Sequence, residues 1–420
     1  MLQSLLGESI ITKVLFFIGI LIVAGDLAAT LFTIIYQRFI FSRLMRPKYK
    51  ESFKPRASIV VPCKGIPKNF GKNLRGFLEL DYPDYEVIYV VESANDSAVP
   101  EINKIISEDK RAKLVVAGIS SECAQKNHNM LAALRQTDNP EVYVFADSDI
   151  KPRKEWLSEI VLPLSDPKIT VTTGFRWLMP TRGSLGELTH SYVNIFIYTC
   201  FCAACYFGGV GLWGGSMAIR RKDFEEMGVG QKWSRAAVDD MSLSAVVLKN
   251  GRRAVVVPTC ITLTDDLLPT MKSSITWFER QIMFLKAYQR LLWLFPTLPI
   301  TIGAAVLLLL LPFALLGSLF TDHSFLSLGG GVALTFYLGH TLVALLYPML
   351  GKMPYFFRFL LLQPVLRFTH IISYLRTYLT RTITWAGIKY HLAFNGDVAS
   401  IERLEVQEEM PAPELSTLEG

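Results

Sequence analysis

The sequence predicts an α/β domain with a mostly parallel sheet covered by helices, carried on membrane segments at both ends of the chain. Short runs rich in β-branched residues alternate with helical stretches over residues 57–146, a pattern typical of parallel sheets. Long apolar segments precede and follow this region. Of the 420 residues, 51% are hydrophobic and 19% charged, which argues against both a freely soluble enzyme and a largely disordered chain.

The first apolar segment, residues 14–36, is long enough to cross a bilayer and is interrupted by one acid, Asp26. It has no small-residue cleavage signature, so we interpret it as a retained anchor. Basic residues dominate the next 20 positions, which predicts that the domain after the anchor lies in the cytosol. Asp26 is either a functional acid or a contact to another helix or a lipid headgroup, and the contact is favoured. Residues 1–50 form the predicted anchor with its basic flank.

The C-terminal part, residues 291–395, reads as a second membrane region. Two uncharged stretches, 298–320 and 328–350, predict a transmembrane hairpin whose flanks carry the basic residues and so return to the cytosol. Residues 355–378 are apolar but contain three arginines and a proline, which favours an interfacial or re-entrant helix. The acidic segment 396–420 is predicted to be a disordered tail.

Between these regions, residues 51–290 form the predicted catalytic domain. Function in parallel sheets gathers at the carboxyl ends of the strands, and polar residues such as Lys64, Glu92 and Asp147 follow the strands here. The expected strands are 57–62, 85–91, 113–117 and 141–146, with helices around residues 73–80, 102–110 and 128–135.

Two acidic pairs are the main candidates for chemistry. Asp147 and Asp149 follow an apolar strand, and together they present hard oxygen ligands for a divalent ion that bridges a diphosphate. Asp239 and Asp240 open a predicted helix, 241–248, after a Trp-Gly-Gly-Ser turn. For both pairs, helix capping is the alternative interpretation.

Residues 191–215 are uncharged and long enough to be mistaken for another span. If they crossed the membrane, Asp147 and Asp240 would lie on opposite sides. We therefore expect residues 192–207 to be an apolar, partly interfacial segment that lines the path of a lipid acceptor. The three cysteines in this stretch indicate free thiols rather than zinc ligands, because no histidine lies among them. A net charge of +6, placed beside apolar segments, favours a membrane surface over nucleic acid.

Several ordered motifs together resemble ceramide glucosyltransferases, especially the plant-like branch. The similarity covers about residues 57–288, and the octapeptide Ile-Thr-Trp-Ala-Gly-Ile-Lys-Tyr at 383–390 resembles a short motif that follows the membrane part in this family. Hopanoid-linked and diacylglycerol-linked relatives share much of the pattern. The motifs are Leu-Asp-Tyr-Pro-Asp-Tyr-Glu-Val at 80–87, Val-Val-Glu-Ser at 90–93, Val-Val-Ala-Gly-Ile at 115–119, Gln-Lys-Asn-His-Asn at 125–129, the Asp147 loop, Leu-Trp-Gly-Gly at 212–215 and Asp-Asp-Met at 239–241.

The resemblance implies a GT-A fold, a nucleotide-sugar donor and inversion at the anomeric carbon. Inversion needs a base to deprotonate the acceptor hydroxyl, and the family places it at Asp240. The resemblance also implies that Asp147 and Asp149 hold Mg²⁺ or Mn²⁺ against the diphosphate of a UDP-sugar, and that the acceptor is a membrane lipid. The remaining implied substrate-binding residues are Pro62, Lys64, Glu92 with Asp96 as a weaker alternative, Lys126, Trp213, Gly214, Gly215, Asp239 and Gln281.

One motif departs from the animal members of the family, which carry a second Arg followed by Trp where this chain reads Glu279-Arg280-Gln281-Ile-Met-Phe284. We assign stabilisation of the leaving group to Arg280, with Lys286 as the substitute cation. The alternative interpretation of Arg280 is a residue that extends toward the membrane surface.

The predicted function is the transfer of one sugar to a lipid such as ceramide, and glucose is the sugar that we expect. A processive polysaccharide synthase would need more membrane spans and the complete Arg-Trp motif. A scaffold with a degenerate transferase domain would have lost an acidic motif, whereas all three acidic regions are retained. Glucose, galactose and N-acetylglucosamine remain open as donors, as do ceramide, diacylglycerol and hopanoid as acceptors.

Overall fold

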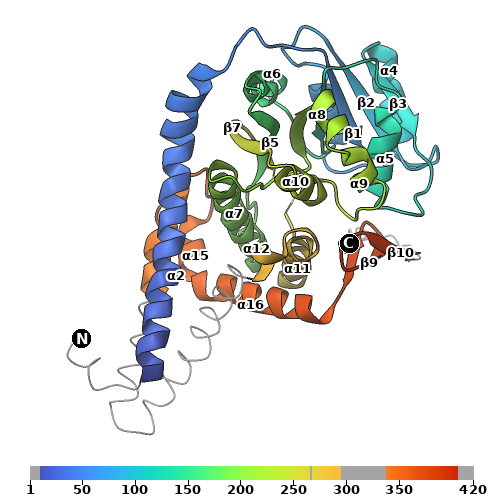
Figure 1. The fold of residues 1–420 in the computed structure, drawn as a ribbon. Helices are drawn as coiled ribbons and strands as arrows, with labels where there is room; N and C mark the ends of the chain where they lie inside the picture. Colours follow the sequence, from blue (N-terminus) through green and yellow to red (C-terminus); the bar gives the residue numbers. More distant parts are fainter. Residues whose placement is uncertain (1–9, 265–266, 295–336, 405–420) are drawn as a thin grey trace, which may run out of the picture.

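A seven-stranded sheet forms the centre of the molecule (Figure 1). The computed structural model describes residues 10–264, 267–294 and 337–404. The strand order is β3-β2-β1-β4-β6-β5-β7. The strands are β1 (Ala57–Pro62), β2 (Tyr85–Val91), β3 (Ala112–Val116), β4 (Val142–Ala146), β5 (Ile169–Leu178), β6 (Ser216–Arg220) and β7 (Arg253–Thr264).

The sheet is mostly parallel, as predicted. Strand β1 pairs in parallel with β2 and β4, β2 with β3, and β5 with β7, whereas β6 runs antiparallel to both β4 and β5. Every residue of β2 and β4 is buried, which explains why β4 is a continuous apolar run and why β2 has a single charged residue, Glu86, paired with Lys113 at 2.8 Å. The bounds of β1 and β2 match the prediction, and those of β3 and β4 differ by one residue.

Helices cover this sheet. Helix α5 packs against β1, β2 and β3, and α6 packs against β5, β6 and β7. The helices of the domain are α3 (Phe70–Gly76), α4 (Val99–Glu108), α5 (Gln125–Leu134), α6 (Trp156–Val161) with the 3₁₀ turn η3 (Leu162–Ser165), α8 (Arg221–Glu226), α9 (Val229–Trp233) and α10 (Asp240–Lys249). The predicted helices are therefore present, and α10 begins one residue earlier than expected.

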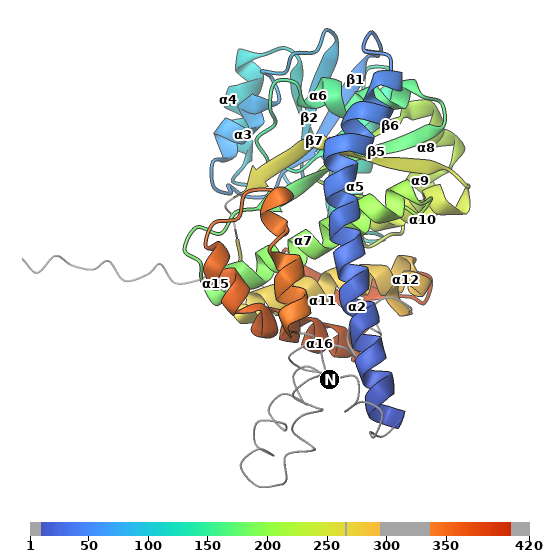
Figure 2. The ribbon, with the colours of Figure 1, turned by 90° about the vertical axis from the view of Figure 1, so that its left-hand side faces the viewer.

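Helix α2 (Ile10–Ile35) projects beyond the other helices and strands that the structure describes, in both views (Figures 1 and 2). It continues into η1 (Tyr36–Met45) and η2 (Arg46–Lys48). The stretch from Phe17 to Lys48 is long and apolar enough to cross a membrane, and only 22% of its apolar window is buried. Asp26 Oδ2 lies 3.0 Å from Nδ1 of His340, so the predicted contact between Asp26 and another helix is confirmed.

Helix α7 (Leu185–Tyr206) contains most of the uncharged stretch. Ser184 begins it by accepting a hydrogen bond from the Glu187 amide. Its length and composition also suit a membrane span, but 67% of its apolar window is buried, because it packs against β5, β7, α2 and α11 (Met271–Tyr288). This burial supports a core helix rather than a crossing one. The cysteines in it are free thiols.

The predicted C-terminal hairpin falls largely on residues 295–336, which lie outside the described residues. Residues 337–344 are helical, and the short 3₁₀ helix η4 (Tyr347–Met349) follows them. The predicted interfacial helix is in fact two helices, α15 (Phe356–Leu361) and α16 (Gln363–Leu379). Pro364 lies in the first turn of α16. It cannot continue the helix from α15, because proline has no backbone N–H to donate to the carbonyl four residues earlier. Helix α16 runs beside α11.

The prediction of a disordered tail is wrong for its first residues. Strands β8 (Thr382–Trp385), β9 (Ile388–Leu392) and β10 (Val398–Arg403) form a second, antiparallel sheet. Strand β10 pairs along β9, and Val398 and Ile401 pack on a small apolar core. The acidic composition averaged over 396–420 concealed these two apolar positions, and residues 405–420 lie outside the described part.

Candidate active site

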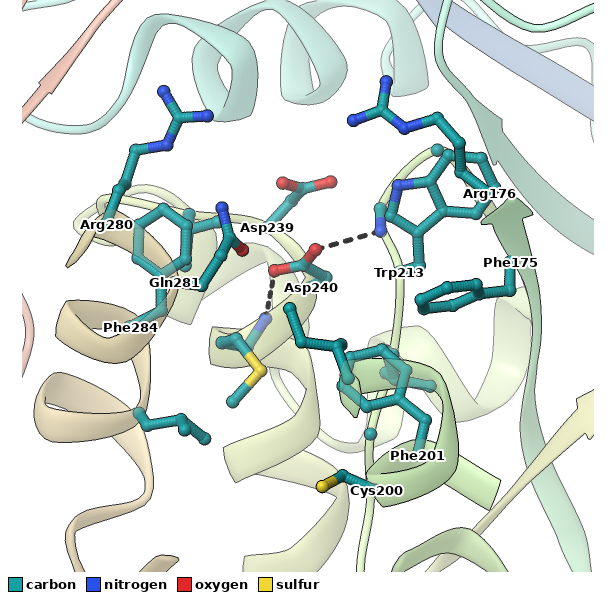
Figure 3. A pocket seen from close by; sticks show the side chains of 18 of the residues that line it. Phe175, Arg176, Cys200, Phe201, Trp213, Asp239, Asp240, Arg280, Gln281 and Phe284 are labelled. Atoms are coloured by element: carbon teal, nitrogen blue, oxygen red, sulfur yellow. Dashed lines mark hydrogen bonds between the residues drawn. The ribbon is translucent and has the colours of Figure 1, made fainter. Parts of the chain in front are cut away.

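A cavity of about 230 Å³ lies where the seven-stranded sheet meets α7, α10 and α11. Figure 3 shows two guanidinium groups, Arg176 and Arg280, at one end, Cys200 and Phe201 at the other, and Asp240 between them. One end is therefore charged and the other apolar. The cavity brings together most of the predicted site residues: Lys126, Asp147, Trp213, Gly214, Gly215, Asp239, Asp240, Arg280 and Gln281.

Lys126 joins the two acidic motifs. It lies in the first turn of α5, and its ammonium is 2.8 Å from Asp147 Oδ1 and 3.1 Å from Asp239 Oδ2. Burial disfavours the charge on Lys126, but Asp147 and Asp239 outweigh it and raise the pKa of Lys126. Burial likewise disfavours the charge on Asp147, yet Lys126 lowers the pKa of Asp147 overall. The centre is thus an ionised network in a largely buried position.

Asp240 is the first residue of α10 and accepts two backbone hydrogen bonds. Its Oδ2 accepts from the Gly214 amide at 3.0 Å and its Oδ1 from the Met241 amide at 2.6 Å. Burial, and then the charge of Asp239, raise the pKa of Asp240 to about 7, although Lys126 opposes them. Asp240 therefore helps to begin the helix and also carries a carboxyl group suited to proton transfer near neutral pH.

Gly214 and Gly215 permit this crowded arrangement. A Cβ on Gly214 would collide with the Asp239 carboxylate, and a Cβ on Gly215 would lie 2.5 Å from Asp147 Oδ2 and collide with the Trp213 ring. The two glycines let the backbone pass between the acidic motifs, and they leave room on the Oδ2 side of Asp147.

Asp149 takes a different position from Asp147. Its Oδ2 accepts a 2.7 Å hydrogen bond from Arg176, a residue of β5 that was not among the predicted site residues. The Arg176 guanidinium also lies 5.7 Å from the centre of the Trp213 ring. The sequence held one indication of this residue: Arg176 is the single charged residue in the apolar run Phe175-Arg176-Trp177-Leu178. A charged residue on a buried strand is expected to have a partner.

Arg280 projects from α11 into the cavity. Its guanidinium lies 5.7 Å from the centre of the Trp385 ring, and within the described chain it forms no ion pair with a carboxylate. Burial, and then the nearby charge of Arg176, lower the pKa of Arg280 to about 10. Lys286, the substitute cation, lies elsewhere: its ammonium donates to the carbonyls of Thr377 and Thr380, and it is not among the residues that line the cavity.

The residues predicted to bind uridine lie beside this cavity, at the ends of β1 and β2. Pro62 is the last residue of β1. Lys64 lies 3.8 Å from Glu92, so these two are brought together. Asp96 instead accepts hydrogen bonds from the amides of Gly65 and Ala98, both at 2.9 Å, which gives it a role in a turn.

The residues present fit a divalent cation at Asp147. One carboxylate oxygen binds Lys126, and the other faces the room left by Gly215. Across residues 10–264, 267–294 and 337–404, no group of three or more His, Cys, Asp and Glu side chains is arranged as a metal site. Mg²⁺ commonly needs only one or two carboxylates because substrate phosphates and water complete its shell. Asp149 holds Arg176 through Oδ2 only.

A mostly parallel sheet with acidic motifs at its strand ends, joined to a half-apolar cavity, defines a glycosyltransferase with a GT-A-like fold. The chain belongs to glycosyl transferase family 21, whose family model matches residues 25–398.

Two relatives have names that agree with this family. The chain is 21% identical to ceramide glucosyltransferase 1 of Caenorhabditis elegans, over 48% of this chain and 44% of that protein. It is 27% identical to ceramide glucosyltransferase 3 of the same organism, over 31% of this chain and 29% of that protein. These matches span less than half the length of the curated relatives.

Among solved structures, the fold is similar to that of the mannosyltransferase PcManGT from Pyrobaculum calidifontis, which was solved with GDP-Man and Mn²⁺. The TM-score is 0.56 with 17% sequence identity, covering 87% of this chain and 99% of that chain. This similarity establishes the fold.

Proposed function

We propose that this protein transfers one glucose from UDP-glucose to the primary hydroxyl of a membrane lipid such as ceramide, with inversion. The observation that carries the proposal is the position of Asp240, between a charged end suited to a sugar nucleotide and an apolar end suited to a lipid. The sequence relatives named ceramide glucosyltransferase support the same acceptor class.

On the donor side, Pro62, Lys64 and Glu92 would hold the uridine at the ends of β1 and β2. Arg280 and Lys126 would face the diphosphate. Mg²⁺ or Mn²⁺ held by Asp147, with Asp149 as the second carboxylate, would neutralise phosphate charge when bound. If Asp149 binds the ion, Arg176 would exchange its contact with Asp149 for a contact with the phosphate oxygens, because a guanidinium binds phosphate and carboxylate oxygens alike.

On the acceptor side, α7 and α11 supply the apolar wall. Ile197, Cys200, Phe201 and Ala204 lie along one face of α7 and line the cavity, which supports the prediction that this segment guides the lipid. A lipid hydroxyl placed at the boundary between the two ends would lie next to Asp240, and the alkyl chains would occupy the apolar wall.

The exposed apolar side chains support a membrane position for this end of the molecule. Phe17 and Leu21 on α2, Phe357 and Leu361 on α15, and Leu379 on α16 are each more than 60% exposed, which is unusual for water-facing helices. We propose that residues 1–50 and 291–395 attach the enzyme to the bilayer and that the catalytic domain, residues 51–290, faces the cytosol.

In this mechanism, Asp240 takes the proton of the lipid hydroxyl while the oxygen attacks the anomeric carbon from the face opposite the diphosphate. Arg280 stabilises the negative charge that grows on the departing diphosphate. The buried setting strengthens both effects, since charges interact more strongly where water is excluded.

The proposal is tested with the purified full-length protein in lipid nanodiscs. Radiolabelled UDP-glucose, UDP-galactose and UDP-N-acetylglucosamine are offered one at a time with ceramide, diacylglycerol or a hopanoid, and the lipid products are identified by mass spectrometry. A single β-linked glucose on ceramide is the expected product. Transfer only to diacylglycerol or a hopanoid would show that ceramide is not the acceptor. A polymeric product would show that the enzyme is a processive synthase and would contradict the proposal.

The pKa of Asp240 predicts the pH dependence of the reaction. The base acts only when it is deprotonated, so kcat/KM should fall about tenfold per pH unit below pH 7. Because the charge of Asp239 raises the pKa of Asp240, Asp239→Asn should move this acidic limb to lower pH. Initial rates from pH 5 to 9 check this, and a profile that stays flat down to pH 5 would contradict it.

Removal of the divalent ion should lower turnover by at least about tenfold, since the ion neutralises charge on the leaving diphosphate. Activity should return on addition of Mg²⁺ or Mn²⁺. Asp147→Asn should raise the concentration of Mn²⁺ needed for half-maximal activity. EDTA-dialysed protein that keeps full turnover would rule out the ion.

A further inference from the structure

The turn between β8 and β9 reaches into the donor end of the cavity. Trp385, the last residue of β8, lines this cavity. Its ring centre lies 5.7 Å from the Arg280 guanidinium and 5.9 Å from the Lys126 ammonium. One aromatic ring from the end of the chain thus contacts two cations from two different helices of the catalytic domain.

The position of Trp385 is set by a tight turn. Trp385 pairs with Ile388 across a two-residue loop, and both loop residues, Ala386 and Gly387, have positive φ angles of 51° and 76°. Such loops match the twist of a hairpin, although alanine adopts this conformation at a cost. The carbonyl of Ala386 accepts a 3.0 Å hydrogen bond from Lys64, which ties the turn to the end of β1.

The rest of the small sheet is also held against the active site. Ile383, Ile388 and Tyr390 form an apolar core with Val238 and Met241, the residues on either side of the Asp239–Asp240 pair. Farther along, Arg403 in β10 donates to Glu92 and, at 2.7 Å, to Gln125. The hairpin is therefore a fixed wall of the site.

We propose that Trp385 is a positioning residue for Arg280. The ring face attracts the guanidinium through its quadrupole, and it leaves the full positive charge of Arg280 available. A carboxylate in the same place would hold Arg280 as well, but it would neutralise the charge that a departing diphosphate requires. This role rests on the proposed function, in which Arg280 acts on the leaving group.

The test compares Trp385→Leu, Trp385→Phe and Phe394→Ala in the full-length protein. Trp385→Leu keeps apolar bulk and removes the ring, so it should lower kcat about tenfold with little change in KM for the UDP-sugar. Trp385→Phe should restore most of the activity. Phe394, 3.7 Å from Arg290 and in the same sheet region, is the control for general damage to the sheet, and Phe394→Ala should leave kcat unchanged.

The dependence on Arg280 is measured in the Arg280→Ala background, where Trp385→Leu should have no further effect on kcat. An equal loss with and without Arg280, or wild-type kcat in Trp385→Leu, would overturn the positioning role.

A second readout does not need the proposed reaction. Phenylglyoxal modifies accessible arginines, and mass spectrometry of the peptide that contains Arg280 should show faster modification in Trp385→Leu than in wild type and Phe394→Ala. Unchanged modification overturns the contact itself. If modification changes as expected while the wild-type protein glycosylates no lipid, then the proposed function fails and the contact between Trp385 and Arg280 stands.

Discussion

Replacing Asp240 by asparagine should lower the turnover of glycolipid formation by about 10²- to 10⁴-fold, the usual contribution of a general base. Asparagine keeps the size of the side chain and an oxygen to accept the hydrogen bond from Gly214, so α10 should stay folded. The binding of UDP-sugar should remain nearly intact because the donor contacts lie on other residues. Single-turnover rates and a UDP-sugar titration on the same preparation separate the two effects.

The matched control is Asp239→Asn, one residue earlier. Asp239 binds Lys126 at 3.1 Å, so this variant should loosen the ionised centre and lower the rate less than Asp240→Asn does. If Asp240→Asn turned over at the wild-type rate and Asp239→Asn did not, the base would be Asp239.

Replacing Arg280 by alanine should lower kcat by about 10²-fold, with the dissociation constant of UDP changed only a few-fold. A cation that faces the leaving diphosphate acts mainly on the charge that develops in the transition state. The guanidinium is largely buried and has no carboxylate partner among the described residues, so its charge is available to the substrate. Isothermal titration with UDP and steady-state rates check this pair of expectations.

Lys286→Ala provides the control, since Lys286 is also a cation of α11 but binds the carbonyls of Thr377 and Thr380. It should change kcat by much less than Arg280→Ala does. Loss of UDP affinity in parallel with turnover in Arg280→Ala would show that Arg280 only docks the nucleotide.

Local patterns were sufficient for strands β1 to β4 and for the acidic motifs, but they did not predict β5, β6, β7 or the C-terminal sheet. The runs 57–62 and 85–91 are short and rich in β-branched and aromatic residues, which favours buried strands over helices. The carboxyl ends of parallel strands lie along one edge of the sheet. For this reason Asp147 could be assigned to this edge from the sequence, whereas Asp239 and Asp240 were assigned to the site from the family resemblance. The structure places all three around one cavity. The catalytic and binding roles given to them remain predictions.

The partners of these residues were not predictable in the same way. Nothing local to Asp149 indicates that Arg176, 27 positions later, would bind it, and the charge-rich composition of the tail concealed strand β10. Lys286 and Arg280 look equivalent as cations on one helix. The packing of α16 against α11 is what directs Lys286 to the carbonyls of Thr377 and Thr380.

The sequence by itself determined the class of domain, the family and the acidic motifs, because alternating apolar runs and the residues at their ends are local properties. Only the tertiary structure decided that Trp385, from the C-terminal sheet, lies on Arg280 and Lys126, and that Arg403 binds Glu92. These contacts join residues more than 100 positions apart. Their geometry depends on how the C-terminal sheet packs on the catalytic domain, and no local pattern encodes that packing.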